Sequence, residues 1–98
     1  MTTKDYILST IESHKPELTR YGVQKVGLFG SYSRNEQSEK SDIDVLIDFD
    51  TDKENFDNYM AVCDYLETLF KDEKVEIVTL NGLSPYIGSS ILKEVLYV

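Results

Sequence analysis

The stretch "GSYSRNEQSEKSDID", residues 30–44, begins with a Gly-Ser pair and ends with two aspartates that are one residue apart. The apolar segment "VQKVGLF" (23–29) precedes it, and the alternating segment "IDVLIDF" (43–49) overlaps its end. Both segments have the residue types and the pattern of β-strands. The stretch therefore predicts a polar loop between two strands, with a turn at Gly30 and two acids on one face of the second strand.

The rest of the sequence predicts a single α/β (α+β) domain that spans residues 1–98, since 98 residues with 41% hydrophobic content suffice for one modest core. A third strand is expected at residues 74–80. Helices are expected at 3–14, from Pro16, at 55–70 and at 85–97. The 55–70 helix leaves room for a crossover between the second and third strands, whereas antiparallel and mixed pairing both remain open for the first two.

Two of these helices carry apolar side chains that need a partner surface. The apolar stripe of the 55–70 helix is predicted to comprise Phe56, Tyr59, Met60, Cys63, Leu66 and Phe70. The 85–97 helix ends in Leu96, Tyr97 and Val98, which either form a binding face or fold back onto the first helix and complete the core.

Charge and composition exclude several classes of protein. The net charge of -8 disfavours a general nucleic-acid binder, which needs a basic face to neutralise phosphates. One cysteine and one histidine cannot form a His/Cys metal cluster, and a lone cysteine suits a reducing compartment. The sequence has neither a signal-peptide pattern nor an apolar run of the ~20 residues that cross a bilayer. We therefore expect a cytoplasmic protein without a membrane segment.

Asp42 and Asp44 are the first candidate site residues. Period-two spacing puts both carboxylates on one strand face, where they repel each other unless a cation lies between them. Mg²⁺ takes oxygen ligands and accepts one or two carboxylates plus substrate phosphates, and two such ions can bind the attacking and leaving oxygens of a phosphoryl transfer. The alternative is a solvated strand face, because the chain holds 18 acids.

Gly30, Ser31 and Arg34 are candidates for binding a phosphate. A glycine between a strand and a helical turn lets the backbone approach a ligand, and free N–H groups at such a turn favour an anion. The Ser31 hydroxyl adds a donor, and the Arg34 side chain can reach a phosphate from one turn further on. The alternative is an ordinary strand-to-turn glycine beside a surface arginine.

Glu76 is the third candidate acid, in the strand segment "VEIV". A glutamate beside the aspartates on a neighbouring strand can bind a second metal ion or deprotonate an incoming hydroxyl. The alternative is an exposed position on a sheet that is covered on one side only.

The combination of Gly30-Ser31, ten further residues and Asp42-x-Asp44 resembles the signature of the nucleotidyltransferase fold, the superfamily of DNA polymerase beta. The ending "VTLNGLSPYIGSSILKEVLYV" resembles the minimal nucleotidyltransferases of prokaryotes, and the resemblance covers nearly the whole chain. It implies a mixed sheet with helices packed on one side.

The resemblance also implies a function: Mg²⁺-dependent transfer of AMP from ATP to a hydroxyl. Gly30 and Ser31 would hold the triphosphate, Asp42 and Asp44 the metal ions, and Arg34 occupies a position that is often basic. Many such proteins resemble antitoxins that adenylylate or simply bind a HEPN-domain RNase toxin, so a HEPN-domain partner and a homo- or hetero-oligomer are implied.

One departure from the family pattern concerns the third acid, which is commonly aspartate where this chain has Glu76. The extra methylene moves the carboxylate by about one C–C bond, and catalysis is sensitive to displacements of ~1 Å. Two alternatives to a protein-modifying enzyme therefore remain. One is an antitoxin that neutralises its toxin by binding alone. The other is an aminoglycoside-type nucleotidyltransferase, which is less expected because 98 residues supply no evident second domain to enclose a small acceptor.

Overall fold

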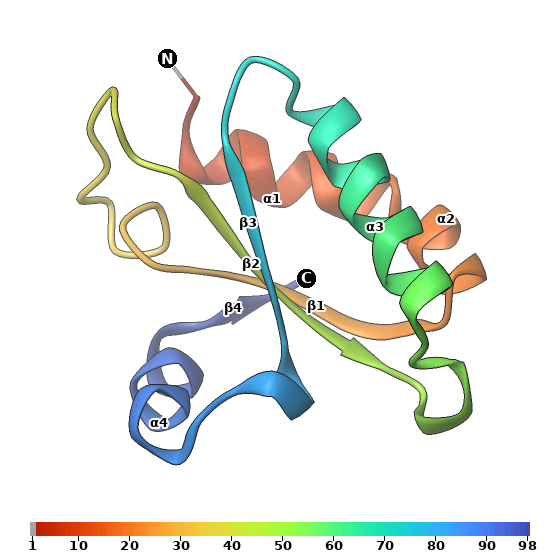
Figure 1. Ribbon diagram of the computed structural model, residues 1–98. Coiled ribbons are helices and arrows are strands. Elements are labelled where there is room, and N and C mark those ends of the chain that lie inside the picture. Colours follow the sequence, from red (N-terminus) through yellow and green to blue (C-terminus); the bar gives the residue numbers. More distant parts are fainter. Residues whose placement is uncertain (1) are drawn as a thin grey trace.

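A four-stranded sheet forms the centre of the computed structural model, which describes residues 2–98 (Figure 1). Its strands are β1 (Val23–Phe29), β2 (Ile43–Phe49), β3 (Val75–Thr79) and β4 (Leu96–Tyr97), in the spatial order β3-β2-β1-β4. β1 pairs antiparallel with β2 and with β4, whereas β2 and β3 are parallel. The predicted mixed sheet is confirmed, and the question left open for the first two strands is answered by antiparallel pairing.

The helices begin where the sequence carries capping residues. They are α1 (Lys4–Ser13), α2 (Lys15–Arg20), α3 (Phe56–Leu69) and α4 (Pro85–Glu94), with short 3₁₀ turns at Thr51–Lys53 and Leu80–Gly82. The side chains of Thr3, Asn55 and Ser84 accept hydrogen bonds from backbone N–H groups in the first turns of α1, α3 and α4. No helix within residues 2–98 is long and apolar enough to cross a membrane.

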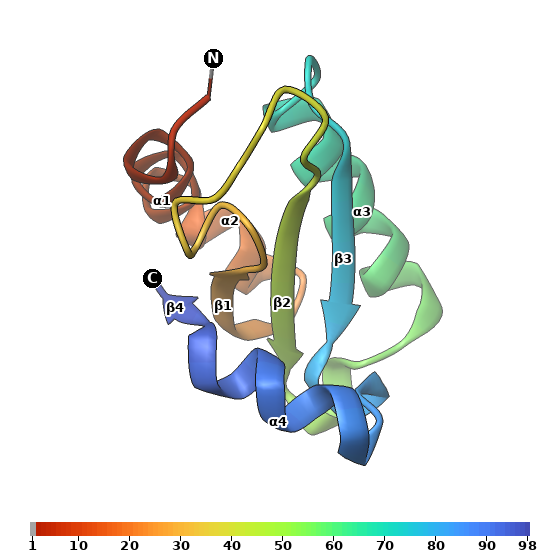
Figure 2. The same ribbon diagram turned by 90° about the vertical axis from the view of Figure 1, so that its left-hand side faces the viewer.

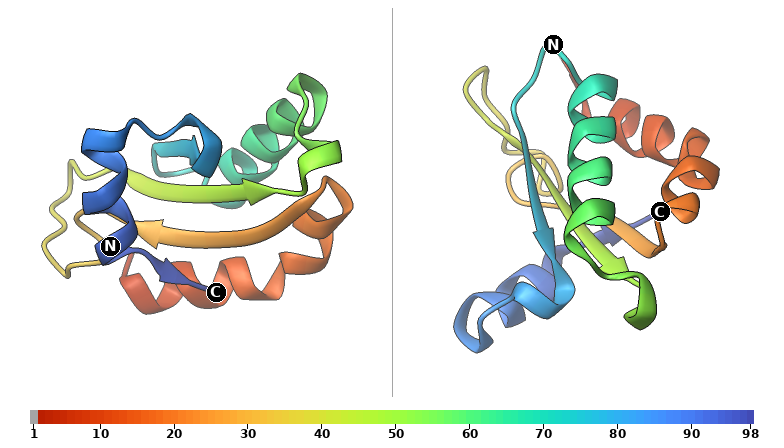
Figure 3. Two further views of the ribbon diagram at one scale, coloured as in Figure 1. Left: turned by 90° about the horizontal axis from the view of Figure 1, so that it is seen from below. Right: turned by 45° about the vertical axis from the view of Figure 1, so that its right-hand side comes forward.

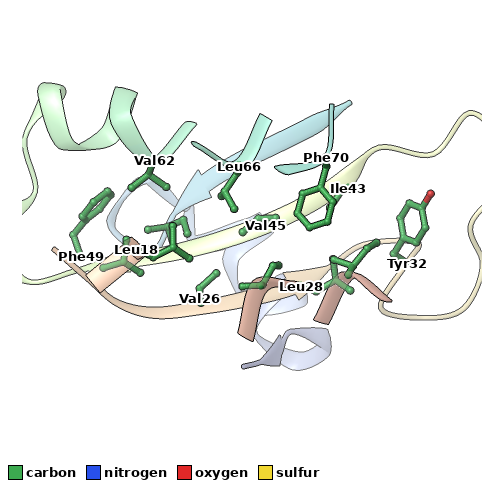
Figure 4. Packing of buried hydrophobic residues seen from close by; sticks show 14 residues of the cluster. Leu18, Val26, Leu28, Tyr32, Ile43, Val45, Phe49, Val62, Leu66 and Phe70 are labelled. Carbon is green, nitrogen blue, oxygen red and sulfur yellow. The ribbon is translucent and has the colours of Figure 1, made fainter. Parts of the chain in front are cut away.

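The main core lies between one face of the sheet and helices α1, α2 and α3 (Figures 1 and 4). The alternating residues of β2 supply its centre, as predicted from their period of two. The buried members are Ile7, Ile11, Leu18, Val23, Val26, Leu28, Tyr32, Ile43, Val45, Ile47, Phe49, Val62, Leu66 and Phe70.

The apolar stripe predicted for α3 is wrong in part. Phe56 and Met60 are 75% and 40% exposed, while Val62, which the prediction left out, is fully buried beside Leu66. The core-facing positions are spaced by three and four residues around Val62 and Leu66, so the stripe is rotated about the helix axis from the predicted one. Both faces of this helix carry apolar residues, and helical spacing alone therefore could not identify the inner face.

The fourth helix lies against the opposite face of the sheet (Figure 2). There Ile91 packs on Phe29 of β1 and Leu46 of β2 in a small second cluster. The expectation of helices on one side only therefore needs correction, because β1 and β2 each turn one apolar residue towards α4.

The chain end is also different from the prediction. Helix α4 ends at Glu94, and Leu96–Tyr97 form β4 on the free edge of β1, so the helix does not continue to residue 97. The Val98 N–H donates to the Val26 carbonyl, and Val98 packs against the main core. Of the two alternatives for this tail, completion of the core is confirmed, because β4 extends the sheet and Val98 packs against the main core. A binding face at the tail stays a prediction.

Candidate active site

The three predicted acids lie where β2 begins and runs beside β3. In the β-sheet register Asp44 is opposite Phe29 of β1 on one side and Glu76 of β3 on the other. Residues paired across neighbouring strands point to the same face, so the two carboxylates share the face that α4 partly covers. Asp42 precedes β2 and is half-buried, whereas Glu76 is exposed. Figure 3 (left) shows α4 next to the end of β1, the start of β2 and the polar loop.

Gly30 connects the end of β1 to the turn above Asp44. Its φ angle is +79°, in the region that glycine adopts without strain. A Cβ atom at this position would lie 2.1 Å from Oδ2 of Asp44. The backbone at residue 30 therefore approaches the Asp44 carboxylate so closely that a residue with a side chain does not fit at this position.

Residues 31–35 form the predicted helical turn, which a buried tyrosine anchors. The Arg34 N–H donates to the Gly30 carbonyl and the Glu36 N–H to the Ser31 carbonyl. Tyr32 is 1% exposed and lies at one end of the main core (Figure 4). Sequence analysis missed this anchoring role, although the signal was present: Tyr32 is the one aromatic residue in an otherwise polar loop.

A fourth acid, Glu94, completes the site and was not predicted. It is the last residue of α4, and its Oε2 accepts a hydrogen bond from the Gly30 N–H at 2.5 Å. Nη1 of Arg34 lies 2.9 Å from both carboxylate oxygens of Glu94, while Nε of the same arginine bonds Glu36 at 2.8 Å. No signal in the sequence distinguishes Glu94 from the other acids, because the contact joins residues 60 positions apart.

Electrostatics at this site disfavour the charged form of Asp44. The pKa of its carboxyl is raised from 3.8 to about 6, mainly by burial and further by the charges of Glu76, Asp42 and Glu94, while the charge of Arg34 acts in the opposite direction. Within residues 2–98, the carboxylates of Asp42, Asp44 and Glu76 form no hydrogen bond or ion pair. The site thus holds neighbouring acids whose charges Arg34 compensates only in part.

The donor set fits a hard divalent cation that brings further ligands with it. In the described part of the chain, no group of three or more acidic, histidine or cysteine side chains is placed to hold a metal ion by itself. Mg²⁺ commonly binds through one or two carboxylates, with water and substrate phosphates as its remaining ligands. Asp42 and Asp44 match that description, and Glu76 is the nearest further carboxylate.

A hollow of about 370 Å³ opens beside these acids, between the sheet and α4. Asp44 and Glu76 form its polar end, and its other walls are apolar side chains of β1, β3 and α4, among them Phe29, Val78 and Ile91. A larger hollow of about 630 Å³ lies between the end of α3 and the start of β3, but none of the predicted site residues lines it. The chemistry of the lining favours the smaller one as the reaction site.

Comparison with known proteins agrees with this geometry. The family model described as "Polymerase beta, Nucleotidyltransferase" matches residues 12–98. The chain belongs to this nucleotidyltransferase family. The protein adenylyltransferase MntA of Thermococcus cleftensis is 38% identical over 99 residues, which cover 100% of this chain and 98% of that protein. The resemblance inferred from Gly30-Ser31 and Asp42-x-Asp44 is thereby confirmed, together with the nucleotidyltransferase class.

Two solved structures extend the comparison to the fold. A chain described as a "putative minimal nucleotidyltransferase" superimposes with a TM-score of 0.82 at 27% identity, covering 97% of this chain and 95% of that one. A chain from a crystal structure of a toxin–antitoxin with AMP-PNP gives a TM-score of 0.66 at 22% identity, covering 98% of this chain and 72% of that one. The second likeness concerns the fold alone.

Proposed function

We propose that this nucleotidyltransferase transfers AMP from ATP to a hydroxyl of a protein partner, with Mg²⁺ as cofactor. The observation that carries the proposal is the pairing of Asp44 with Glu76 across two strands, with the Gly30 backbone directly against Asp44. The protein adenylyltransferase named above, similar over the whole chain, supports a protein as acceptor.

Each site residue has a role in this reaction. The Gly30 N–H, the Ser31 hydroxyl and the Arg34 guanidinium bind the triphosphate, because all three can donate to phosphate oxygens. Asp42 and Asp44 would hold Mg²⁺, which would neutralise the charge of the phosphates and the charge that develops on the leaving group. Glu76 accepts the proton of the acceptor hydroxyl. The hydroxyl oxygen bonds the α-phosphorus of ATP, and the bond between that phosphorus and pyrophosphate breaks.

The partner we propose is a HEPN-domain toxin in the cytoplasm. A chain of the same fold was crystallised in a toxin–antitoxin complex, so the fold is compatible with such a partner. Helix α4 offers a docking surface, since Tyr86, Ile87 and Leu92 are 91%, 61% and 47% exposed. Of these three residues, Ile87 lines the hollow at Asp44. The partner itself would present the hydroxyl to Glu76.

A second candidate function is neutralisation of the toxin by binding alone. The observation that favours it is Glu94, whose carboxylate occupies the Gly30 N–H and Arg34 that we assign to the triphosphate. Catalysis and binding alone differ in one measurable product, the AMP-modified partner.

Labelling of the partner decides between the two functions. When it is co-purified with the HEPN-domain protein, the wild type is expected to label that protein from ATP that carries a radioactive α-phosphate. ATP labelled at the γ-phosphate should give no labelled protein, because this phosphate leaves with pyrophosphate. Asp44→Asn serves as the control without a complete metal site. A stable complex that takes up no α-label would leave the binding-only function, and the absence of any complex would refute the HEPN partner.

Nucleotide binding is expected to require the divalent cation. Free ATP approaches a cluster of unpaired carboxylates, so its affinity should be at least about tenfold lower without Mg²⁺. Isothermal titration calorimetry with ATP, in Mg²⁺ and in EDTA, measures the difference. Equal affinities in the two titrations would contradict the assignment of Asp42 and Asp44 as metal ligands.

A further inference from the structure

Glu94 forms hydrogen bonds with two of the groups that we assign to the triphosphate, the Gly30 N–H and the Arg34 guanidinium. Its carboxylate accepts the Gly30 N–H at 2.5 Å and lies 2.9 Å from Nη1 of Arg34 through both oxygens. A carboxylate and a phosphate present the same kind of negatively charged acceptor, and both form charge-assisted hydrogen bonds with a guanidinium and a backbone N–H. The two anions therefore compete for the same donors.

The position of Glu94 is unfavourable apart from these contacts. Its charge is among those that act against ionisation of Asp44, so the carboxylate adds to a cluster that is already acidic. Its side chain is only 25% exposed, which limits screening by solvent. The contacts with Gly30 and Arg34 hold it there, and a stronger anion with its own cation can replace it.

We propose that Glu94 is an internal competitor of ATP: its carboxylate fills the phosphate-binding donors in the free protein and must leave them when Mg²⁺·ATP binds. The inference rests on the proposed function, since it requires Gly30 and Arg34 to bind phosphate. Glu94 thereby lowers the affinity for nucleotide without taking part in the chemistry.

The neighbouring contacts suit such an exchange. Arg34 keeps its bond to Glu36 when Glu94 leaves, so the guanidinium stays near the turn. Glu94 is the last residue of α4, and its side chain can swing away while Ile91 holds the helix on the sheet. The apparent dissociation constant then equals the intrinsic one divided by the fraction of molecules in which the donors are free.

Glu94→Gln tests the proposal because it keeps the shape of the side chain and removes its charge. Calorimetry with Mg²⁺·ATP, and separately with Mg²⁺ and inorganic triphosphate, is expected to give dissociation constants about tenfold lower than those of the wild type. Glu36→Gln is the matched control, since it removes the same charge from the same arginine without a contact to Gly30. A much smaller gain is expected for this control.

The outcomes distinguish failure of the competitor role of Glu94 from failure of the proposed AMP transfer. Unchanged or weaker binding by Glu94→Gln, or an equal gain in Glu36→Gln, would overturn the competitor role and leave Glu94 as a tie between α4 and the turn. If no protein binds Mg²⁺·ATP or triphosphate, the proposed function itself fails and the inference falls with it. Should Glu94→Gln not fold, Glu94→Asp withdraws the carboxylate from Gly30 by one methylene, and the same gain or its absence decides.

Discussion

Replacement of Asp44 by Asn is expected to reduce AMP transfer at least about a thousandfold, while making the metal-free protein more stable at neutral pH. The loss would follow from removal of the charged carboxylate that we propose as a metal ligand, because loss of one electrostatic group in an active site typically lowers the rate by a factor of this order. The gain in stability follows from the environment of this carboxyl, which burial and the charges of Glu76, Asp42 and Glu94 make unfavourable when ionised. Loss of activity together with gain of stability distinguishes a site residue from a structural one.

The pH dependence of this stability gain has a defined sign. The folded-state pKa of Asp44 is about 6, above the ordinary 3.8, so the wild type is most favoured where this carboxyl is protonated. Its stability relative to Asp44→Asn is expected to fall as the pH rises from about 4 through 6 and then to level off. The shift corresponds to at most about 3 kcal/mol, which solvent screening at this half-exposed position reduces to about 1 kcal/mol.

Asp48→Asn is the matched control, because Asp48 lies on the same strand but bonds the Gln24 side chain far from Gly30. It is expected to change neither transfer nor the pH profile of stability. Thermal unfolding in EDTA from pH 4 to 8 and the α-label assay measure the two effects. Near-normal transfer by Asp44→Asn would exclude it as a metal ligand, and an equal gain by Asp48→Asn would attribute the stability to net charge.

The elements near the site could be predicted from the sequence because their signals are local. β1 and β2 have the predicted bounds, 23–29 and 43–49, since a turn glycine and a polar loop delimit two apolar segments. β4 could not be predicted, because two residues have no period of their own and become a strand only by pairing with Gly27 and Leu28. Short edge strands depend on contacts that are distant in the sequence.

In the candidate site, too, local signals could be read from the sequence, whereas contacts between distant residues could not. Asp42 and Asp44 follow from spacing along one strand, and the β2–α3–β3 crossover made it reasonable to expect Glu76 nearby. The register that sets Asp44 opposite Glu76 needed the structure. Glu94 was beyond prediction, since its role arises from packing of α4 on Phe29 and Leu46, which brings the helix end to Gly30.

Gly30→Ala is expected to impair both stability and nucleotide binding. The φ angle of +79° costs a residue with a side chain about 1–2 kcal/mol, and the new Cβ would lie 2.1 Å from Oδ2 of Asp44 and force that carboxylate to move. A displacement of ~1 Å at a reacting site is enough to lower the rate about a hundredfold. We therefore expect a loss of about 2 kcal/mol in unfolding free energy and at least about a hundredfold loss of transfer.

Gly22→Ala provides the comparison that separates the two effects. Gly22 has a φ of +91°, and a Cβ there would lie 2.5 Å from Cβ of Lys53, so its backbone strain is similar to that at Gly30 but remote from the acids. Both variants should lose stability in urea unfolding, whereas only Gly30→Ala should lose Mg²⁺·ATP affinity and transfer at a temperature where both are folded. If Gly22→Ala lost as much transfer as Gly30→Ala, the effect would be one of general stability. If Gly30→Ala transferred AMP normally, the close approach of its backbone to Asp44 would have no part in the reaction.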